Sequence, residues 1–177
     1  MIFRPTQLKK VYIIEQEPHN DERGYFARIF CKEELAKAGI MFDVVQVSHS
    51  LTKEKGTIRG MHFQKEPKSE DKIVQCLRGK IYDVVVDLRR DSSTYGQWIA
   101  EELSEDNKKI LFIPKGCAHG FQTLTDSCLV QYFMDEFYSS EHASGVRWDD
   151  PFFGITWPVK EPILSPQDAQ WPLINSS

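Results

Sequence analysis

The chain has 177 residues, 41% of them hydrophobic, and a formal net charge of −4 at neutral pH. This length is enough for one domain with a substantial core and too short for two ordinary domains without a linker, so we expect one domain over residues 1–177. The negative charge provides no basic surface for nucleic acid, which excludes that class of partner. No apolar run is long enough for a secretion signal or a membrane span, which predicts a cytoplasmic protein without a membrane partner.

The predicted strands are short runs rich in Val, Ile, Phe and Tyr, separated by Gly, Pro, Asp or Ser. In chain order they are Val11–Ile14, Tyr25–Phe30, Val44–Val47, Ile58–Gln64, Ile73–Leu77, Ile81–Leu88, Gln97–Glu101, Ile110–Ile113, His119–Leu124 and Cys128–Met134. One short helix is predicted at Lys32–Ala38, where Glu, Leu and Ala precede Gly39. After Tyr138 the prolines predict loops and turns. About ten strands must close on themselves or form two packed sheets, so the expected fold is all-β, a jelly roll or barrel.

The four cysteines, at positions 31, 76, 117 and 128, are scattered and include no CxxC pair. This spacing favours reduced thiols buried as small apolar residues over a disulfide framework or a zinc site. Cys117 lies in a loop that looks functional, but no motif around it indicates a nucleophile.

Two segments with a histidine beside glycine, Arg59–Gln64 and Pro114–Gly120, are expected to face each other across one pocket. The alternation of a strand places Gly60, His62 and Gln64 on one face, which is therefore polar. In the second segment, Pro114 and Gly116 suit a tight turn before a strand that begins at His119.

The pattern from Pro114 to His119 resembles the second motif of the cupin superfamily of small β-barrels. Metal-binding cupins also need two histidines one residue apart and a later glutamate, because several N and O ligands must converge on the ion. In this chain Gln64 stands two residues after His62, and the next carboxylates, Glu66 and Glu70, lie in a loop. The metal cage is incomplete, and a metal-dependent cupin enzyme stays open as an alternative.

Five segments in order resemble the dTDP-4-dehydrorhamnose 3,5-epimerase family: Asp21–Phe26, Arg59–Gln64, Tyr82–Arg89, Ile113–Phe121 and Gly145–Pro151. The resemblance covers nearly the whole chain. It implies a metal-free cupin-type double-stranded β-barrel without a cofactor, assembled as a homodimer. It also implies a reaction that inverts C3 and C5 of a nucleotide-diphospho-4-keto-6-deoxyhexose, in the simplest case converting dTDP-4-dehydro-6-deoxy-D-glucose to dTDP-4-dehydro-L-rhamnose.

The implied chemistry needs a base, a group that stabilises an enolate, and an acid on the opposite face of the sugar. The family pattern makes His62 the base, with Asp168 as the carboxylate that fixes its tautomer. It also places Lys72 near the keto oxygen, Tyr132 as the acid, and Asp83 near the reacting groups. Considered singly, each has an ordinary structural explanation, such as a bonded core histidine, a turn carboxylate, a solvated edge lysine or a core aromatic.

The resemblance implies a second group of residues that bind the substrate. Arg23, Arg59 and His119 match contacts to the diphosphate and sugar, and guanidinium groups suit phosphate oxygens. Gln46 and Tyr138 match contacts to the base. Four residues on the nucleotide side depart from the common pattern, since Arg28, Ser48, Ala143 and Gln167 stand where the family often has Glu, Asn, Glu and Lys. Arg28 and Ser48 are still expected to bind substrate, and the identity of the nucleotide stays open.

Three further functions fit the sequence. A related epimerase could act at one carbon or on another nucleotide. A metal-dependent cupin would contain iron, manganese or zinc and lose activity with a chelator, whereas a silent sugar-binding cupin would bind the nucleotide sugar without exchanging its protons.

Overall fold

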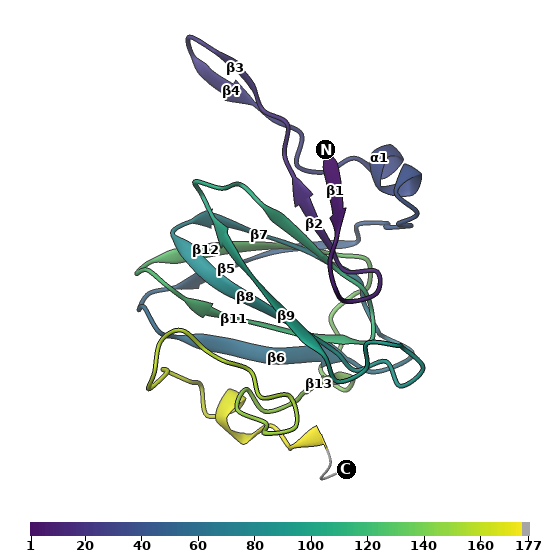
Figure 1. Cartoon of the computed structure of the whole chain (residues 1–177), viewed down its shortest axis with the longest axis vertical. Helices are drawn as coiled ribbons and strands as arrows, with labels where there is room; N and C mark the ends of the chain where they lie inside the picture. Colours follow the sequence, from purple (N-terminus) through teal and green to yellow (C-terminus); the bar gives the residue numbers. More distant parts are fainter. Residues whose placement is uncertain (175–177) are drawn as a thin grey trace.

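The computed structural model describes residues 1–174, so the last three residues of the expected domain lie outside it. Two antiparallel sheets pack face to face, as Figure 1 shows. The first sheet contains, in spatial order, β1 (Ile2–Pro5), β2 (Tyr12–Glu15), β10 (Ile110–Ile113), β7 (Lys72–Arg78), β12 (Cys128–Met134) and β5 (Gln46–Thr52). The second contains β13 (Ala143–Gly145), β6 (Ile58–Gln64), β11 (Cys117–Thr123), β8 (Lys80–Asp87) and β9 (Trp98–Ser104). The predicted all-β jelly roll is confirmed.

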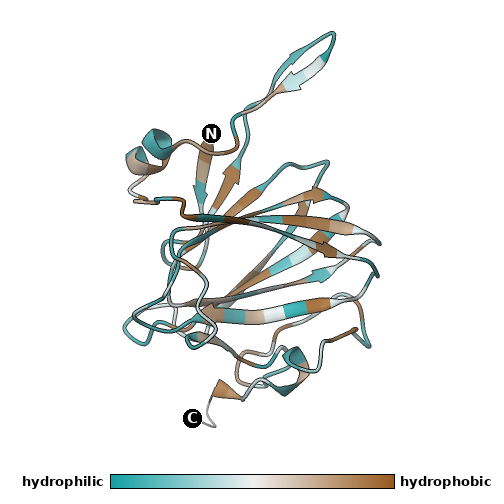
Figure 2. Cartoon of the chain, turned by 180° about the vertical axis from the view of Figure 1, so that it is seen from behind, coloured by the Kyte–Doolittle hydropathy of each residue, from teal (hydrophilic) through white to brown (hydrophobic). Residues whose placement is uncertain are grey.

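The main core lies between the two sheets. Val74 and Val130 from the first sheet pack in one buried cluster with Val85, Leu103 and Phe121 from the second. Figure 2 shows the apolar residues alternating with polar ones along several strands, which is the period of a sheet with two different faces. Every residue of β10 and β11 is buried, which fits their place inside the sheets. Burial of this apolar surface is the main favourable contribution to folding.

Most predicted strands are confirmed, three of them with the predicted bounds: Ile58–Gln64, Ile110–Ile113 and Cys128–Met134. The helix α1 covers Lys32–Lys37, as expected. The predicted strand Tyr25–Phe30 is wrong in extent, because β4 (Gly24–Phe26) ends at Phe26 and pairs only with β3 (His19–Asp21). The sequence analysis missed β1, β3 and β13, all of them only three or four residues long.

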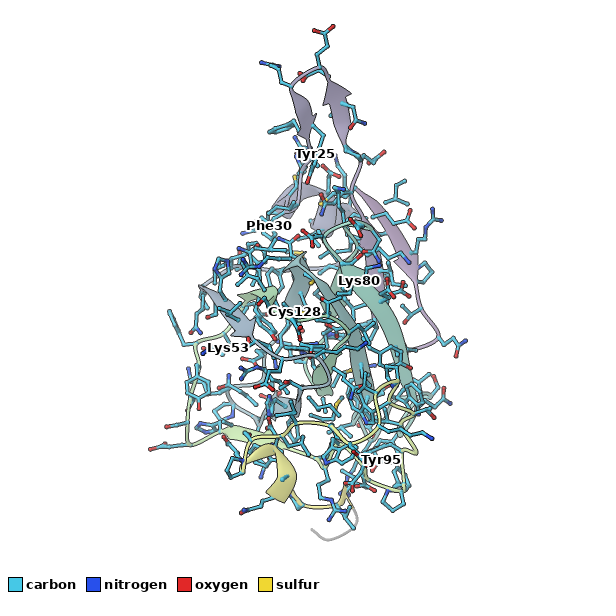
Figure 3. The ribbon with its side chains drawn as sticks, turned by 90° about the vertical axis from the view of Figure 1, so that its left-hand side faces the viewer. Tyr25, Phe30, Lys53, Lys80, Tyr95 and Cys128 are labelled. Atoms are coloured by element: carbon cyan, nitrogen blue, oxygen red, sulfur yellow. The ribbon has the colours of Figure 1, made fainter. Side chains whose placement is uncertain are left out.

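The β3–β4 hairpin projects from the barrel at the end opposite the C-terminal segment (Figure 1). Figure 3 places Tyr25 on this projection, and the centroid of its ring lies 5.0 Å from Lys108 Nζ in the segment before β10. Tyr25 is 56% exposed and Phe26 is 73% exposed. Large aromatic side chains at this exposure gain little from the fold of their own chain, and clustered exposed apolar groups are typical of contact surfaces.

The four cysteines are free, and all except Cys31 are buried. Cys117 is buried, and burial raises the pKa of its thiol to about 12, which favours the packing interpretation over a nucleophile. Within residues 1–174, no helix combines the length and apolar character that crossing a membrane requires. The cytoplasmic location expected from the sequence stays a prediction.

Candidate active site

A pocket of about 360 Å³ lies between the two sheets at one end of the barrel. Eight of the predicted site residues line it: Gln46, Ser48, Arg59, His62, Lys72, His119, Tyr132 and Tyr138. They come from β5, β7 and β12 of the first sheet, from β6 and β11 of the second, and from the loop after β12. These eight residues are up to 92 positions apart in the chain, as the bond between Gln46 and Tyr138 shows.

The two histidines are neighbours in one sheet and do not face each other across the pocket, which corrects the expectation from the sequence. His62 on β6 is paired in register with His119 on β11. The register between these strands then shifts, so strict alternation along β6 does not hold. Arg59 and Phe63 consequently line the pocket together with His62 and Gln64. The facing wall is formed by the first sheet, including Tyr132 and Lys72.

His62 is paired with a buried carboxylate. Its Nε2 lies 2.5 Å from Asp168 Oδ1, where Asp168 begins a short 3₁₀ helix, η1 (Asp168–Gln170). Burial alone would raise the pKa of Asp168, but hydrogen bonds from His62, Ser165 and Trp171, with the charge of His62, lower it overall. An ionised carboxylate here holds the imidazole in one tautomer and stabilises its protonated form.

Trp171 is a pocket residue that the sequence analysis missed. Its ring lies edge-on to His62 with 6.0 Å between centroids, and its Nε1 donates to Asp168 Oδ1 at 3.3 Å. A side chain at Gly145 would collide with this ring, since an added Cβ would lie 2.6 Å from it. The available signal was its position three residues after Asp168, one helical turn away.

His119 is paired with Asp83 in the same manner, but deeper in the barrel. The distance from His119 Nε2 to Asp83 Oδ1 is 2.6 Å, and both side chains are buried. Burial raises the pKa of Asp83, against the opposing attraction of His119 and Lys72. Among the described side chains, Asp83 Oδ2 is the one buried oxygen or nitrogen without a hydrogen-bond partner.

Tyr132 stands on β12 with its ring edge-on to His119, 6.1 Å between centroids. Burial, and next the negative charge of Asp83, raise the pKa of the Tyr132 hydroxyl above its ordinary value. The phenol is therefore protonated at neutral pH and has a proton to donate. Its strand belongs to the sheet opposite His62, so the two side chains enter the pocket from different walls.

Lys72 makes an ion pair that the sequence analysis did not predict. Its Nζ lies 2.9 Å from Glu70 Oε1, with the two side chains only 11% and 7% exposed. Glu70 also lines the pocket. Glu70 lies in the loop two residues before Lys72, the first residue of β7, so no strand pattern in the sequence indicated this pair.

The remaining lining residues form a more exposed wall. Gln46 Oε1 accepts a hydrogen bond from the Tyr138 backbone at 3.2 Å, and the Tyr138 side chain is largely exposed. Ser48 lies beside Gln46 on β5, with Gln46 Nε2 3.4 Å from its hydroxyl. Arg59 is held by the Thr52 hydroxyl at 2.9 Å. Ala143 and Gln167, two of the departures from the family pattern, also line the pocket.

Two predicted substrate contacts lie outside this pocket. Arg23 is in the turn of the projecting hairpin, 90% exposed, and pairs with Asp21 at 2.5 Å. Arg28 follows the hairpin and donates to Glu34 on α1 at 2.6 Å. Neither lines the pocket of its own chain, because the segment that carries them extends away from the barrel (Figure 1).

The side chains that metal-binding cupins would use have other partners in this chain. His62 and His119 are each bonded to an aspartate, and the Gln64 amide donates to Glu70 and to two backbone carbonyls. In residues 1–174, no three or more His, Cys, Asp or Glu side chains are grouped so that they could hold a metal ion.

Comparison with known families gives one match that spans almost the whole chain. The model of the family described as dTDP-4-dehydrorhamnose 3,5-epimerase matches residues 5–176. A curated protein of that description from Methanothermobacter thermautotrophicus is 44% identical over 172 residues, covering 96% of this chain and 92% of the relative.

Solved structures with similar folds contain related ligands. The Bacillus anthracis dTDP-4-dehydrorhamnose 3,5-epimerase, with TDP and pyrophosphate bound, is 44% identical and has a TM-score of 0.95, covering 98% of this chain and 99% of the other. The Legionella pneumophila dTDP-6-deoxy-D-glucose-3,5-epimerase, in complex with dTDP-4-keto-L-rhamnose, is 37% identical with a TM-score of 0.93, covering 98% of this chain and 93% of the other.

Proposed function

Because the chain belongs to the dTDP-4-dehydrorhamnose 3,5-epimerase family and is thus a carbohydrate epimerase, we propose that it inverts C3 and C5 of dTDP-4-dehydro-6-deoxy-D-glucose, with His62 removing a proton from the sugar and Tyr132 returning one to the opposite face. The observation that carries this mechanism is the pairing of His62 with Asp168 on one wall of a pocket whose opposite wall holds Tyr132. Inversion of a planar enolate needs a base on one face and an acid on the other.

His62 acts as the base. Its contact with Asp168 through Nε2 leaves Nδ1 to accept a proton from the carbon beside the ketone. Asp168 stays ionised, because its pKa is lowered, and it balances the imidazolium that forms. The same base serves C3 and C5, since both carbons flank the C4 ketone.

Lys72 and Tyr132 complete the proton transfer. When His62 removes a proton, negative charge moves to the keto oxygen, where the Lys72 ammonium stabilises it. Tyr132 then delivers its proton to the opposite face of the carbon, and its raised pKa makes the phenolate a strong enough base to be reprotonated readily. Buried Asp83, bonded to His119 beneath Tyr132, supports this end of the pocket.

The nucleotide and diphosphate occupy the more exposed wall. We assign base contacts to Gln46, Ser48 and Tyr138, where the exposed phenol ring can stack on a planar base. Arg59, which is near the mouth and held by Thr52, suits a phosphate oxygen.

We further propose a homodimer in which the hairpin of one copy reaches the pocket of the other. The resemblance expects Arg23 and Arg28 at the substrate, yet neither lines the pocket of its own chain. Arg23 and Arg28 can contact the substrate without lining their own pocket if the projecting hairpin, with exposed Tyr25 and Phe26, completes the pocket of a second copy. The exposed Val47 and Leu51 on edge strand β5 provide further apolar surface for such a contact.

Deuterium incorporation tests the function directly. The protein is incubated in heavy water with dTDP-4-dehydro-6-deoxy-D-glucose, and NMR follows which carbons gain deuterium and which invert. We expect exchange and inversion at both C3 and C5. Inversion at C3 alone would replace the proposal with a single-centre epimerase, and binding without any exchange would make the protein a sugar-binding cupin. The same assay with UDP, CDP and GDP sugars tests the nucleotide.

A further inference from the structure

The ion pair between Lys72 and Glu70 differs from the ion pairs at the surface of this protein. Its two side chains are 11% and 7% exposed, whereas those of Lys37 and Glu33 are 71% and 75% exposed. A pair removed from water is screened little by salt and holds a defined geometry. Both members line the pocket in which the reaction is proposed to occur.

Glu70 is fixed from a second side. Its Oε2 accepts a hydrogen bond from Gln64 Nε2 at 2.8 Å, while Oε1 faces Lys72. Gln64 stands two residues after His62 on β6, and its Oε1 accepts from the Ser139 backbone at 2.6 Å. The carboxylate therefore joins the strand of the base to the strand of the lysine.

The flexible side chain of a lysine needs a fixed carboxylate partner if its ammonium group is to be held in one position. Its ammonium sits on a flexible stem with four methylene groups and has three N–H donors that can point in several directions, and Glu70 is its ion-pair partner at 2.9 Å. The same pocket contains the cation of Arg59 and gains a second one when His62 takes up a proton. Without the negative charge of Glu70, repulsion from these cations would favour other positions of the ammonium.

We propose that Glu70 is a positioning residue for the epimerisation, which holds the Lys72 ammonium where negative charge develops on the keto oxygen. This inference rests on the enolate-stabilising role proposed above for Lys72. Glu70 exchanges no proton with the sugar, and its contribution is made through Lys72 alone. The enolate is stabilised most when the ammonium is already in place, because moving a charged group during the reaction requires reorganisation free energy.

The first test compares Glu70→Gln with the matched control Glu66→Gln, which changes an exposed carboxylate of the same loop that accepts a hydrogen bond from the Ser69 hydroxyl. For Glu70→Gln we expect kcat to fall about 10- to 100-fold, the effect of losing the interaction between two charged side chains in contact. KM should change by less than about threefold, since the lost interaction acts mainly in the transition state. Glu66→Gln should keep the native kcat and KM. A native kcat in Glu70→Gln would overturn the inference.

The second test is a double-mutant cycle with Lys72→Met. If Glu70 acts through Lys72, then Glu70→Gln should cause no further loss of kcat in the Lys72→Met background, because the group that it positions is absent. An equal loss in both backgrounds would show a role independent of Lys72 and would overturn the inference. If Glu70→Gln does not fold, Glu70→Asp is tested instead. The shorter side chain cannot contact both Lys72 and Gln64, so we expect a lower kcat. A native kcat in Glu70→Asp would contradict the proposal.

The wild-type protein separates the two proposals. Absence of proton exchange with every 4-keto nucleotide sugar would refute the proposed function without reference to Glu70. Normal wild-type turnover with an unaffected Glu70→Gln variant would refute the positioning role alone.

Discussion

The roles proposed for His62 and Tyr132 can be distinguished experimentally because each residue is assigned a different half of the inversion. His62 lies on the second sheet and is hydrogen-bonded to Asp168. Tyr132 lies on the first sheet, with its ring packed edge-on to His119. The sugar must lose a proton before it can receive one. Loss of the base therefore blocks both proton removal and inversion, whereas loss of the acid blocks only the inversion.

For His62→Ala we therefore expect deuterium exchange and inversion to fall together, by about 10²- to 10⁴-fold, the usual contribution of a positioned general base. For Tyr132→Phe, which keeps the ring, we expect exchange to continue while inversion is lost, because His62 can return a solvent proton to the face it came from. NMR in heavy water measures both quantities in one sample. Inversion at the native rate in Tyr132→Phe would show that the tyrosine only packs, and water or Tyr138 would be the next acids to examine.

The sequence predicted the pocket residues that belong to a recognisable motif. His62 and Gln64 lie in the pocket as the strand pattern indicated, and Lys72 and Tyr132 lie there as the resemblance implied. Glu70 and Trp171 were not predicted as pocket residues, because their roles depend on side-chain contacts that belong to no motif, with Gln64 for Glu70 and with Asp168 for Trp171. The exposure of Arg23 was unpredictable for a similar reason, since it depends on where a hairpin points.

At the scale of elements, strand existence was easier to predict than strand ends and strand neighbours. Alternating apolar residues identify β12 with correct bounds, because Val130 is buried between the two sheets. The bounds of β6 were also predicted correctly, and Met61 of this strand packs with Val146 and Phe153 of the C-terminal segment. The order β10-β7-β12-β5 joins strands that are far apart in the chain, and no local pattern encodes it. The pairing of β6 with β11 in the second sheet is equally distant in the chain, and it places His62 beside His119, which explains why facing histidines were wrongly expected.

The end of β8 supplies an element-scale prediction. Asp87 is fully buried and receives hydrogen bonds from Arg89 Nε at 2.8 Å, Ser92 Oγ at 2.6 Å and Thr94 Oγ1 at 2.5 Å, which fold the following loop back on the strand. Burial alone would raise the pKa of Asp87, but these bonds lower it to about 2 from an ordinary value of 3.8. A carboxylate with a lowered pKa stabilises the fold above its unfolded pKa, and this contribution disappears as the pH falls through the folded pKa.

We expect Asp87→Asn to reduce the free energy of unfolding by about 2 kcal/mol at pH 7. The difference from wild type should shrink between about pH 4 and pH 2, where the wild-type carboxylate takes up its proton. Urea unfolding at several pH values measures both effects. Asp91→Asn, which changes an exposed carboxylate in the same loop, is the control and should have nearly wild-type stability. A variant at Asp87 with native stability at pH 7 would contradict this account.

For the whole molecule, the cupin fold raises the question of a metal, because related barrels use the corresponding pocket to bind one. Gln64 occupies the place of a second histidine, and residues 1–174 contain no group of three His, Cys, Asp or Glu side chains that could hold a metal ion. We expect dialysis against a strong chelator to leave the epimerase turnover unchanged. A large loss of turnover that one divalent ion restores would favour the metal-dependent alternative.

The projecting hairpin has a genetic consequence. If Arg23 of one copy serves the pocket of the other, then a chain defective in His62 and a chain defective in Arg23 carry their defects on different sides of the shared site. In a mixed dimer one pocket receives both defects and the other receives none. Two inactive variants, co-expressed in equal amounts, should therefore regain activity at about one quarter of all sites by intragenic complementation. A pocket that used its own hairpin would allow no such recovery, and the mixture would stay inactive.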